Sequence, residues 1–210
     1  MEECNPVAVP MQPGVDVVPA GTLDKKLPYG QLIGGLLFLA RVTRPDIAFA
    51  VGRLSQFNHS YDESHWTLAK RVLRYLKGTL GWGLEYKKEH SLTLQCMVPI
   101  VKIYTDADYA SDKVERKCTT GVAVYLGDSL VHWISQKQQA VALSTTEAEY
   151  VARVAGVKEA VWFRRLCEEL GVEWWEPTEI GVDNQSAIRL VQTLVTWQHR
   201  EHPPFQGTRW

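Results

Sequence analysis

Three short stretches decide the fold of this chain: Ile103-Tyr-Thr-Asp-Ala-Asp108, Leu143-Ser-Thr-Thr-Glu-Ala-Glu-Tyr150 and Ile180-Gly-Val-Asp-Asn-Gln-Ser-Ala-Ile188. The first stretch continues a run with a period of two, which is typical of a strand. The second contains a serine followed three residues later by a glutamate, and this capping-box pattern predicts the start of a helix. The third closes another strand. Each stretch therefore places a carboxylate near one end of a secondary-structure element.

The regions around these stretches complete an α/β pattern. A hairpin signal at 127–129 joins two further apolar runs, and a glycine at 171 ends the long helix. We predict strands over 100–106, 119–126, 130–134 and 179–183, a long helix over 144–171 and a short helix over 184–191.

Two glutamates near the start of the long predicted helix have different roles. Glu147 is the third helical residue, where its side chain can return to the backbone N–H of Ser144, so we assign it to capping. Glu149 lies about 200° further around the helix, in a row of small residues that includes Ala152 and Gly156. Such a row lets a helix approach a sheet closely, where a carboxylate needs a cation as its partner. We therefore choose Glu149 as a metal ligand.

The strand-end aspartates offer the other ligands. Asp106 continues the alternation of its strand, so we assign it to the metal, whereas we expect Asp108 in a loop that bends away. Asp183 ends its strand just before a helix, and capping that helix is the alternative interpretation. Together, Asp106, Glu149 and Asp183 are oxygen ligands of the kind that Mg²⁺ prefers, with Mn²⁺ as a substitute. Two such ions about 4 Å apart favour in-line cleavage of phosphodiesters.

Composition limits the class of protein. The chain has 210 residues, of which 45% are hydrophobic and 22% charged, and a net charge of -1, so any contact with nucleic acid must use a local basic surface. The four cysteines form no Cys-x-x-Cys pair, which argues against a zinc site. The apolar run over 32–40 is shorter than the ~20 residues of a membrane span, and 1–20 does not resemble a signal peptide. We expect an intracellular protein without a membrane partner.

The first half of the chain supplies such a basic surface. Helices are predicted to begin at Tyr29, at Pro45 or Asp46, and at Asp62. The third helix is expected to expose four cations that can follow a nucleic-acid backbone, although a solvated helix face is an equal alternative. These cations are Lys70, Arg71, Arg74 and Lys77.

Four regions follow from these patterns. The first holds five of the ten prolines and is interpreted as a linker or extended arm with little fixed structure. The regions are 1–28 for this arm, 29–99 for the helical part, 100–192 for the α/β part and 193–210 for an atypical tail.

The same motifs resemble a known family. In the second half, five blocks are similar to blocks of the ribonuclease H domain of copia-type LTR retrotransposon Pol polyproteins. They are Tyr104-Thr-Asp-Ala-Asp108, Leu143 to Tyr150, Val182-Asp-Asn-Gln-Ser-Ala-Ile188, Trp133-Ile-Ser-Gln-Lys137 and Lys158-Glu-Ala-Val-Trp162. Upstream, Tyr29-Gly-Gln-Leu-Ile-Gly-Gly35, Thr43-Arg-Pro-Asp-Ile-Ala48, His65-Trp66 and Arg74-Tyr-Leu-Lys-Gly-Thr79 resemble the end of the reverse transcriptase in that polyprotein. The resemblance spans about residues 27–192.

The resemblance implies a ribonuclease H-like mixed sheet with flanking helices, preceded by a small, mainly helical remnant of the reverse-transcriptase thumb and connection. It implies cleavage of the RNA strand of RNA:DNA hybrids, with Asp106, Glu149 and Asp183 as ligands of two Mg²⁺ ions. The implied partners are the hybrid and the remaining reverse-transcriptase segment, in cis or in trans. The polymerase palm would precede this chain, so we expect no polymerase activity from it. The implied location is the cytoplasm, within a virus-like particle, or the nucleus.

The tail departs from the family. The family continues with a histidine, a fourth aspartate and a closing helix, whereas Glu201 is the one acid after Asp183. The alternative hypothesis is therefore a catalytically inactive remnant or a nucleic-acid-binding module of a retroelement. A transposase or integrase of related fold is disfavoured, because Glu149 lies between the two aspartates rather than last.

Overall fold

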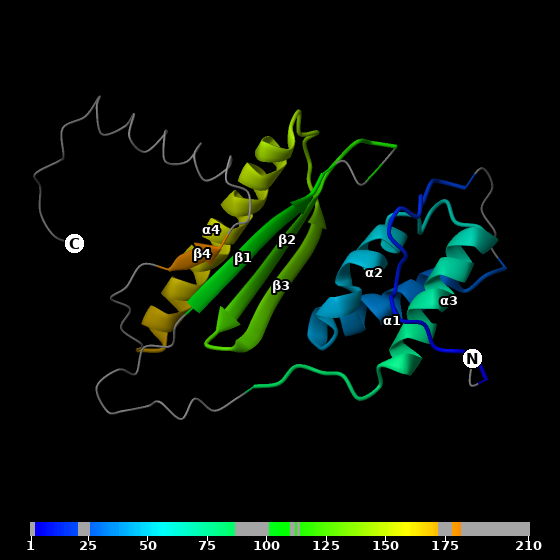
Figure 1. Cartoon of the computed structure of the whole chain (residues 1–210), viewed down its shortest axis with the longest axis horizontal. Helices are drawn as coiled ribbons and strands as arrows, with labels where there is room; N and C mark the ends of the chain where they lie inside the picture. The colour runs from blue at the N-terminus through cyan, green and yellow to red at the C-terminus, as the bar shows by residue number, and fades with distance from the viewer. Residues whose placement is uncertain are drawn as a thin grey trace, which may run out of the picture.

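The computed structural model describes residues 3–20, 26–86, 101–109, 112, 114–171 and 178–181. Figure 1 shows α1, α2 and α3 on one side of the sheet and α4 along the other. The elements in chain order are α1 (Tyr29–Val42), the 3₁₀ turn η1 (Pro45–Ile47), α2 (Ala48–Ser55), α3 (Glu63–Gly78), β1 (Val101–Asp108), β2 (Thr119–Leu126), β3 (Ser129–Lys137), α4 (Thr145–Glu169) and β4 (Glu179–Gly181).

The sheet is mixed. Its strand order is β3-β2-β1-β4, with β1 antiparallel to β2, β2 antiparallel to β3, and β4 parallel to β1. At one end of the sheet, Asp108 pairs with Thr119, which pairs in turn with Lys137. The prediction of an α/β fold with a mixed sheet and flanking helices, preceded by a mainly helical region, is confirmed.

Helix α4 lies very close to β1. Ile103 and Thr105 are buried beneath the helix, as the alternation of β1 requires. A Cβ atom at Gly156 would collide with Cγ2 of Thr105 and would lie 3.4 Å from Cγ2 of Ile103. Ala152, one turn earlier, is also fully buried. The row of small residues therefore allows the close approach that the sequence predicts.

The helices α1 to α3 form a separate core. Tyr29, Ile33 and Leu54 are fully buried in this core, and the Tyr29 hydroxyl donates to the Leu54 carbonyl at 2.9 Å. Helix α3 begins at Asp62, whose carboxylate accepts from the backbone N–H of Ser64 at 2.9 Å. The predicted start of this helix is confirmed. The predicted domain boundary at 99 and 100 lies outside the described residues.

The N-terminal segment packs on this helical core. Val17 is buried, and Val7 and Met11 contact the same core. The backbone N–H of Ala20 donates to the Ser60 carbonyl at 2.9 Å. The expectation of little fixed structure is therefore wrong for residues 3–20, because their apolar side chains cover the core of the helices.

The helical core and the sheet also contact each other. The indole Nε1 of Trp133 in β3 donates to the Ala40 carbonyl in α1 at 2.7 Å. A second contact joins Lys137 at the end of β3 to Gln56, which follows α2, with 3.3 Å between Nζ and Oε1. In the part of the chain that the structure describes, no helix combines the length and hydrophobicity that crossing a membrane requires.

Candidate active site

Two aspartates lie at the end of β1. The Asp106 side chain is exposed, and its Oδ1 accepts from the backbone N–H of Ala107 at 2.8 Å. Asp108 is the last residue of β1 and pairs with Thr119. The expectation that Asp108 lies in a loop is wrong, because pairing with β2 extends the strand through this residue.

The capping role of Glu147 is observed with one difference. Ser144 Oγ accepts from the backbone N–H of Glu147 at 3.1 Å, as the capping box predicts. The Glu147 carboxylate accepts from the backbone N–H of Leu143 at 2.7 Å, one residue before the expected donor. Glu147 thus serves the start of α4.

Glu149 is held at the same end of the sheet. It is only 7% exposed and follows Ala148, which is fully buried and packs with Ala107 at the end of β1. Gln138 fixes this part of α4, because its side-chain amide donates to the Ala148 carbonyl and to Thr120 Oγ1, both at 3.0 Å. Figure 1 shows the start of α4 beside the end of β1.

Asp106 and Glu149 approach this end of the sheet from different sides. Asp106 alternates with Thr105, which lies beneath α4. It lines a largely apolar hollow of about 340 Å³ on the side of the sheet that faces α2, together with Phe49 and Trp133. The two carboxylates therefore share one end of β1 while belonging to different faces.

The third predicted ligand, Asp183, lies outside the described residues. The last described residue of β4 is Gly181, which pairs with Tyr104 of β1. Within the described ranges, no three acidic, histidine or cysteine side chains gather into a group that could hold a metal ion. The assignment of Asp106, Glu149 and Asp183 as a ligand set therefore stays a prediction.

The chemistry of the described donors suits a hard cation. Carboxylate oxygens are the ligands that Mg²⁺ prefers. Glu149 is buried, and buried carboxylates in proteins are paired with positive charge, hydrogen-bonded or bound to metal ions. A divalent ion at this end of the sheet would supply such positive charge.

The predicted basic stripe on α3 is less open than expected. Each of its four cations is half-buried: Lys70, Arg71, Arg74 and Lys77. Arg74 Nε donates to the Asn5 carbonyl at 2.7 Å, and Lys77 Nζ donates to the Cys4 carbonyl at 2.9 Å. The expectation of a fully exposed cationic face is wrong, because the N-terminal segment uses part of that face as its binding surface. The contact of these cations with nucleic acid stays a prediction.

Sequence reasoning missed a charged cluster close to the candidate site, in which Arg53 and Asp112 are buried and Glu115 is exposed. We call it the Asp112 cluster, and its members are Arg53, Asp112, Glu115 and Lys137. Lys137 Nζ contacts Asp112 Oδ2 and lies 3.0 Å from Glu115 Oε1, and Arg53 Nη1 lies 3.5 Å from Asp112 Oδ2. The local sequence shows only that Asp112 is an acidic residue in a predicted turn, and this pattern does not reveal its distant partners Arg53 and Lys137.

Asp112 is ionised despite its burial. The residue is only 4% exposed, and burial by itself raises the pKa of its carboxyl group. The hydrogen bond from Lys137 and those from the backbone N–H groups of Glu115 and Val114 outweigh burial and lower the pKa to about 2. Asp112 is therefore negatively charged at neutral pH.

Comparisons with known proteins identify the family. No protein-family model matches the chain. The chain is 38% identical over 204 residues to the retrovirus-related Pol polyprotein from transposon RE2 of Arabidopsis thaliana, which covers 96% of this chain and 14% of that protein. It is 44% identical over 138 residues to secreted RxLR effector protein 161 of Plasmopara viticola, which covers 66% of this chain and 92% of that protein.

A solved structure is also similar, the crystal structure of LC11-RNase H1 in complex with an RNA/DNA hybrid. That similarity has a TM-score of 0.35 and 15% identity, and it covers 50% of this chain and 79% of the other. The chain spans 14% of the length of the RE2 polyprotein. Its extended identity with transposon polyproteins confirms the predicted relationship: the chain belongs to the family of the retrovirus-related Pol polyproteins of transposons.

Proposed function

We propose that this chain is a ribonuclease H-type segment of a copia-type Pol polyprotein and that it cleaves the RNA strand of RNA:DNA hybrids. The observation that carries the proposal is the position of Glu149, a buried carboxylate held at the end of β1 that also presents Asp106. Membership of the Pol polyprotein family supports the same activity. The RNA:DNA hybrid is proposed as the substrate of this chain, which corresponds to 14% of the length of the RE2 polyprotein.

In this proposal, Asp106, Glu149 and Asp183 would hold two Mg²⁺ ions, which Mn²⁺ could replace. When bound, such ions would activate water and stabilise the leaving oxygen of an in-line displacement. The task of the protein is to hold its carboxylates in place before the substrate arrives. Gln138 helps to hold Glu149 in place by donating to the carbonyl of the preceding residue, Ala148. Pairing with Gly121 of β2 holds the backbone of Asp106.

The proposal includes partners and a location. Besides the hybrid, the remaining reverse-transcriptase segment acts with this chain in cis or in trans. Lys70 and Arg71 are the members of the α3 stripe proposed to contact the nucleic-acid backbone, because Arg74 and Lys77 bind the N-terminal segment. The activity would operate in the cytoplasm, within a virus-like particle, or in the nucleus.

The test is cleavage of a labelled RNA strand annealed to DNA. Wild-type protein should cut the RNA in the presence of Mg²⁺, should stop when the ion is chelated, and should leave the DNA strand and single-stranded RNA intact. Asp106→Asn removes one charged ligand at constant size and should abolish the cleavage. Equal cleavage by the wild type and by folded Asp106→Asn would show that the assignment of Asp106 is wrong.

The second candidate function is hybrid binding without cleavage. The half-buried cations Lys70 and Arg71 of α3 favour it, since they could contact a nucleic-acid backbone whether or not the carboxylates hold metal ions. Folded wild-type protein that binds the hybrid, with an affinity that falls as salt rises, but does not cut it, would establish this function in place of the first.

A further inference from the structure

The Asp112 cluster connects elements that are far apart in the chain. Arg53 belongs to α2 and Lys137 ends β3, whereas Asp112 lies in the connection between β1 and β2. Gln56, just after α2, adds a fourth contact through its Oε1 atom, 3.3 Å from Lys137 Nζ. The cluster thus joins the helical core to the end of the sheet.

Asp112 also organises its own connection. Its Oδ1 accepts from the backbone N–H groups of Val114 at 3.0 Å and Glu115 at 3.2 Å. Its backbone carbonyl accepts from the N–H of Arg116 at 2.7 Å. Arg116 has a positive φ of 58°, a conformation that non-glycine residues adopt only where their surroundings hold them. One carboxylate therefore fixes a tight turn through one oxygen and binds cations through the other.

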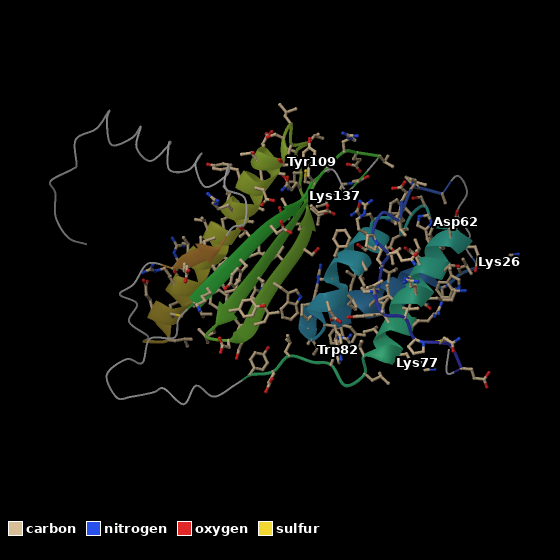
Figure 2. All side chains as sticks on the ribbon, in the orientation of Figure 1. Lys26, Asp62, Lys77, Trp82, Tyr109 and Lys137 are labelled. Carbon is tan, nitrogen blue, oxygen red and sulfur yellow. The ribbon has the colours of Figure 1, made fainter. Side chains whose placement is uncertain are left out.

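The cluster borders the candidate site. Lys137 pairs with Thr119, and Thr119 pairs with Asp108, so all three lie at one level across the sheet. Figure 2 labels Lys137 and Tyr109, the residue after Asp108, at this same end of the sheet. The residue that follows β3 is Gln138, whose side-chain amide donates to the Ala148 carbonyl of α4, next to Glu149.

A second contact links the connection between β1 and β2 to this end of the sheet. The backbone N–H of Gln138 donates to the Cys118 carbonyl at 2.8 Å, and Cys118 is fully buried with Ala148 and Ala107. If the turn moved, the packed side chains of Cys118, Ala107 and Ala148 would therefore move α4 as well.

We infer that Arg53, Asp112 and Lys137 are positioning residues, through which α2 fixes the end of the sheet that presents Asp106 and Glu149. This inference rests on the proposed function for its catalytic meaning. On this inference the helical core contributes to catalysis, because the ion pair between Arg53 of α2 and Asp112 helps to hold the end of the sheet that presents the carboxylates. The buried charges suit this task since their directional contacts fix the turn in one arrangement.

The test is hydrogen–deuterium exchange at the backbone amides of residues 114–117 in the full chain. Arg53→Met keeps the length of the side chain and removes its charge, and it should raise exchange at these amides several-fold. Arg53→Lys should restore part of the protection. Trp133→Phe is the matched control, because it removes a separate hydrogen bond between the sheet and the helical core, to the Ala40 carbonyl, and leaves the cluster intact. It should leave exchange at 114–117 unchanged.

Cleavage of the hybrid supplies the second readout. Arg53→Met should lower kcat on the order of tenfold to a hundredfold, as small displacements of catalytic groups do, with little change in KM. Unchanged exchange at residues 114–117 in folded Arg53→Met overturns the inference, as does an equal increase in Trp133→Phe.

The test still decides the inference if Arg53→Met does not fold or if the wild type does not cleave the hybrid. If Arg53→Met does not fold, Arg53→Gln replaces it, because this variant removes the charge that faces Asp112 and keeps a polar side chain. Raised exchange in Arg53→Gln then supports the inference, and unchanged exchange refutes it. If the wild type does not cleave the hybrid, the proposed function fails, while the exchange measurement still decides whether α2 fixes the turn.

Discussion

The close approach of α4 to β1 predicts the effect of a single methyl group at Gly156. In Gly156→Ala, the new Cβ would overlap Cγ2 of Thr105 and would lie 3.4 Å from Cγ2 of Ile103. Both strand residues are buried, at 5% and 0% exposure, and both are β-branched, so their side chains cannot rotate freely to make room. Either the helix or the strand must shift.

Two opposing effects set the magnitude. Overpacking a well-packed core costs about 1–3 kcal/mol, whereas replacing a helical glycine by alanine stabilises by about 0.5–1 kcal/mol. The net expectation is a loss of about 1–2 kcal/mol in the free energy of unfolding. Gly35→Ala in α1 is the matched control, since nothing lies within 4 Å of its added Cβ, and it should gain about 0.5–1 kcal/mol.

The assay is urea unfolding followed by circular dichroism. If Gly156→Ala proves as stable as the wild type, or gains as much as Gly35→Ala, the contact between α4 and β1 is looser than described. The placement of Glu149 against the sheet would then lose its basis, because that placement depends on the same helix face.

The remaining predictions concern the Asp112 cluster, a helix cap and the metal. Asp112→Asn should lower the free energy of unfolding by about 3 kcal/mol, because it removes the carboxylate that faces the buried Arg53 guanidinium, and an unchanged urea midpoint would contradict this. The pKa of Asp112 is about 2 in the folded protein, against an ordinary 3.8. The ionised carboxylate should therefore stabilise the fold fully above pH 3.8, and this stabilisation should be lost as the pH falls from 3.8 to about 2. Over that range the free energy of unfolding should fall more steeply with decreasing pH in the wild type than in Asp112→Asn. Asp62→Ala should cost about 1–2 kcal/mol by removing the cap of α3, and Asp62→Asn, which keeps an acceptor, should cost clearly less in the same urea titration. Chelation should abolish cleavage of the hybrid, and Mg²⁺ or Mn²⁺ should restore it; cleavage that survives chelation would exclude the two-metal proposal.

Local patterns predict the regular elements well. The alternation over 100–106 gives β1, and the serine and glutamate of the capping box give the start of α4. The same reasoning separates Glu147, which caps, from Glu149, which is buried, because their positions around the helix differ. These features depend on neighbouring residues, so a single sequence contains their signal.

Features that depend on distant partners are not predictable in this way. The end of β1 at Asp108 is set by pairing with β2, and the half-burial of Arg74 is set by the backbone of Asn5. Asp112 and Arg53 meet only because α2 packs near the end of β3. No local pattern marks either residue as part of a cluster, since both have the polar character of ordinary surface residues.

The most direct test of the central claim compares Glu149→Gln with Glu147→Gln in Mg²⁺-dependent cleavage of an RNA:DNA hybrid. The two changes are chemically identical and lie two residues apart, and glutamine at the position of Glu147 retains a capping side chain. Folded Glu149→Gln should lose cleavage while Glu147→Gln keeps it. Retained cleavage in Glu149→Gln would contradict the account, because the buried carboxylate at the start of α4 would then have no part in the chemistry.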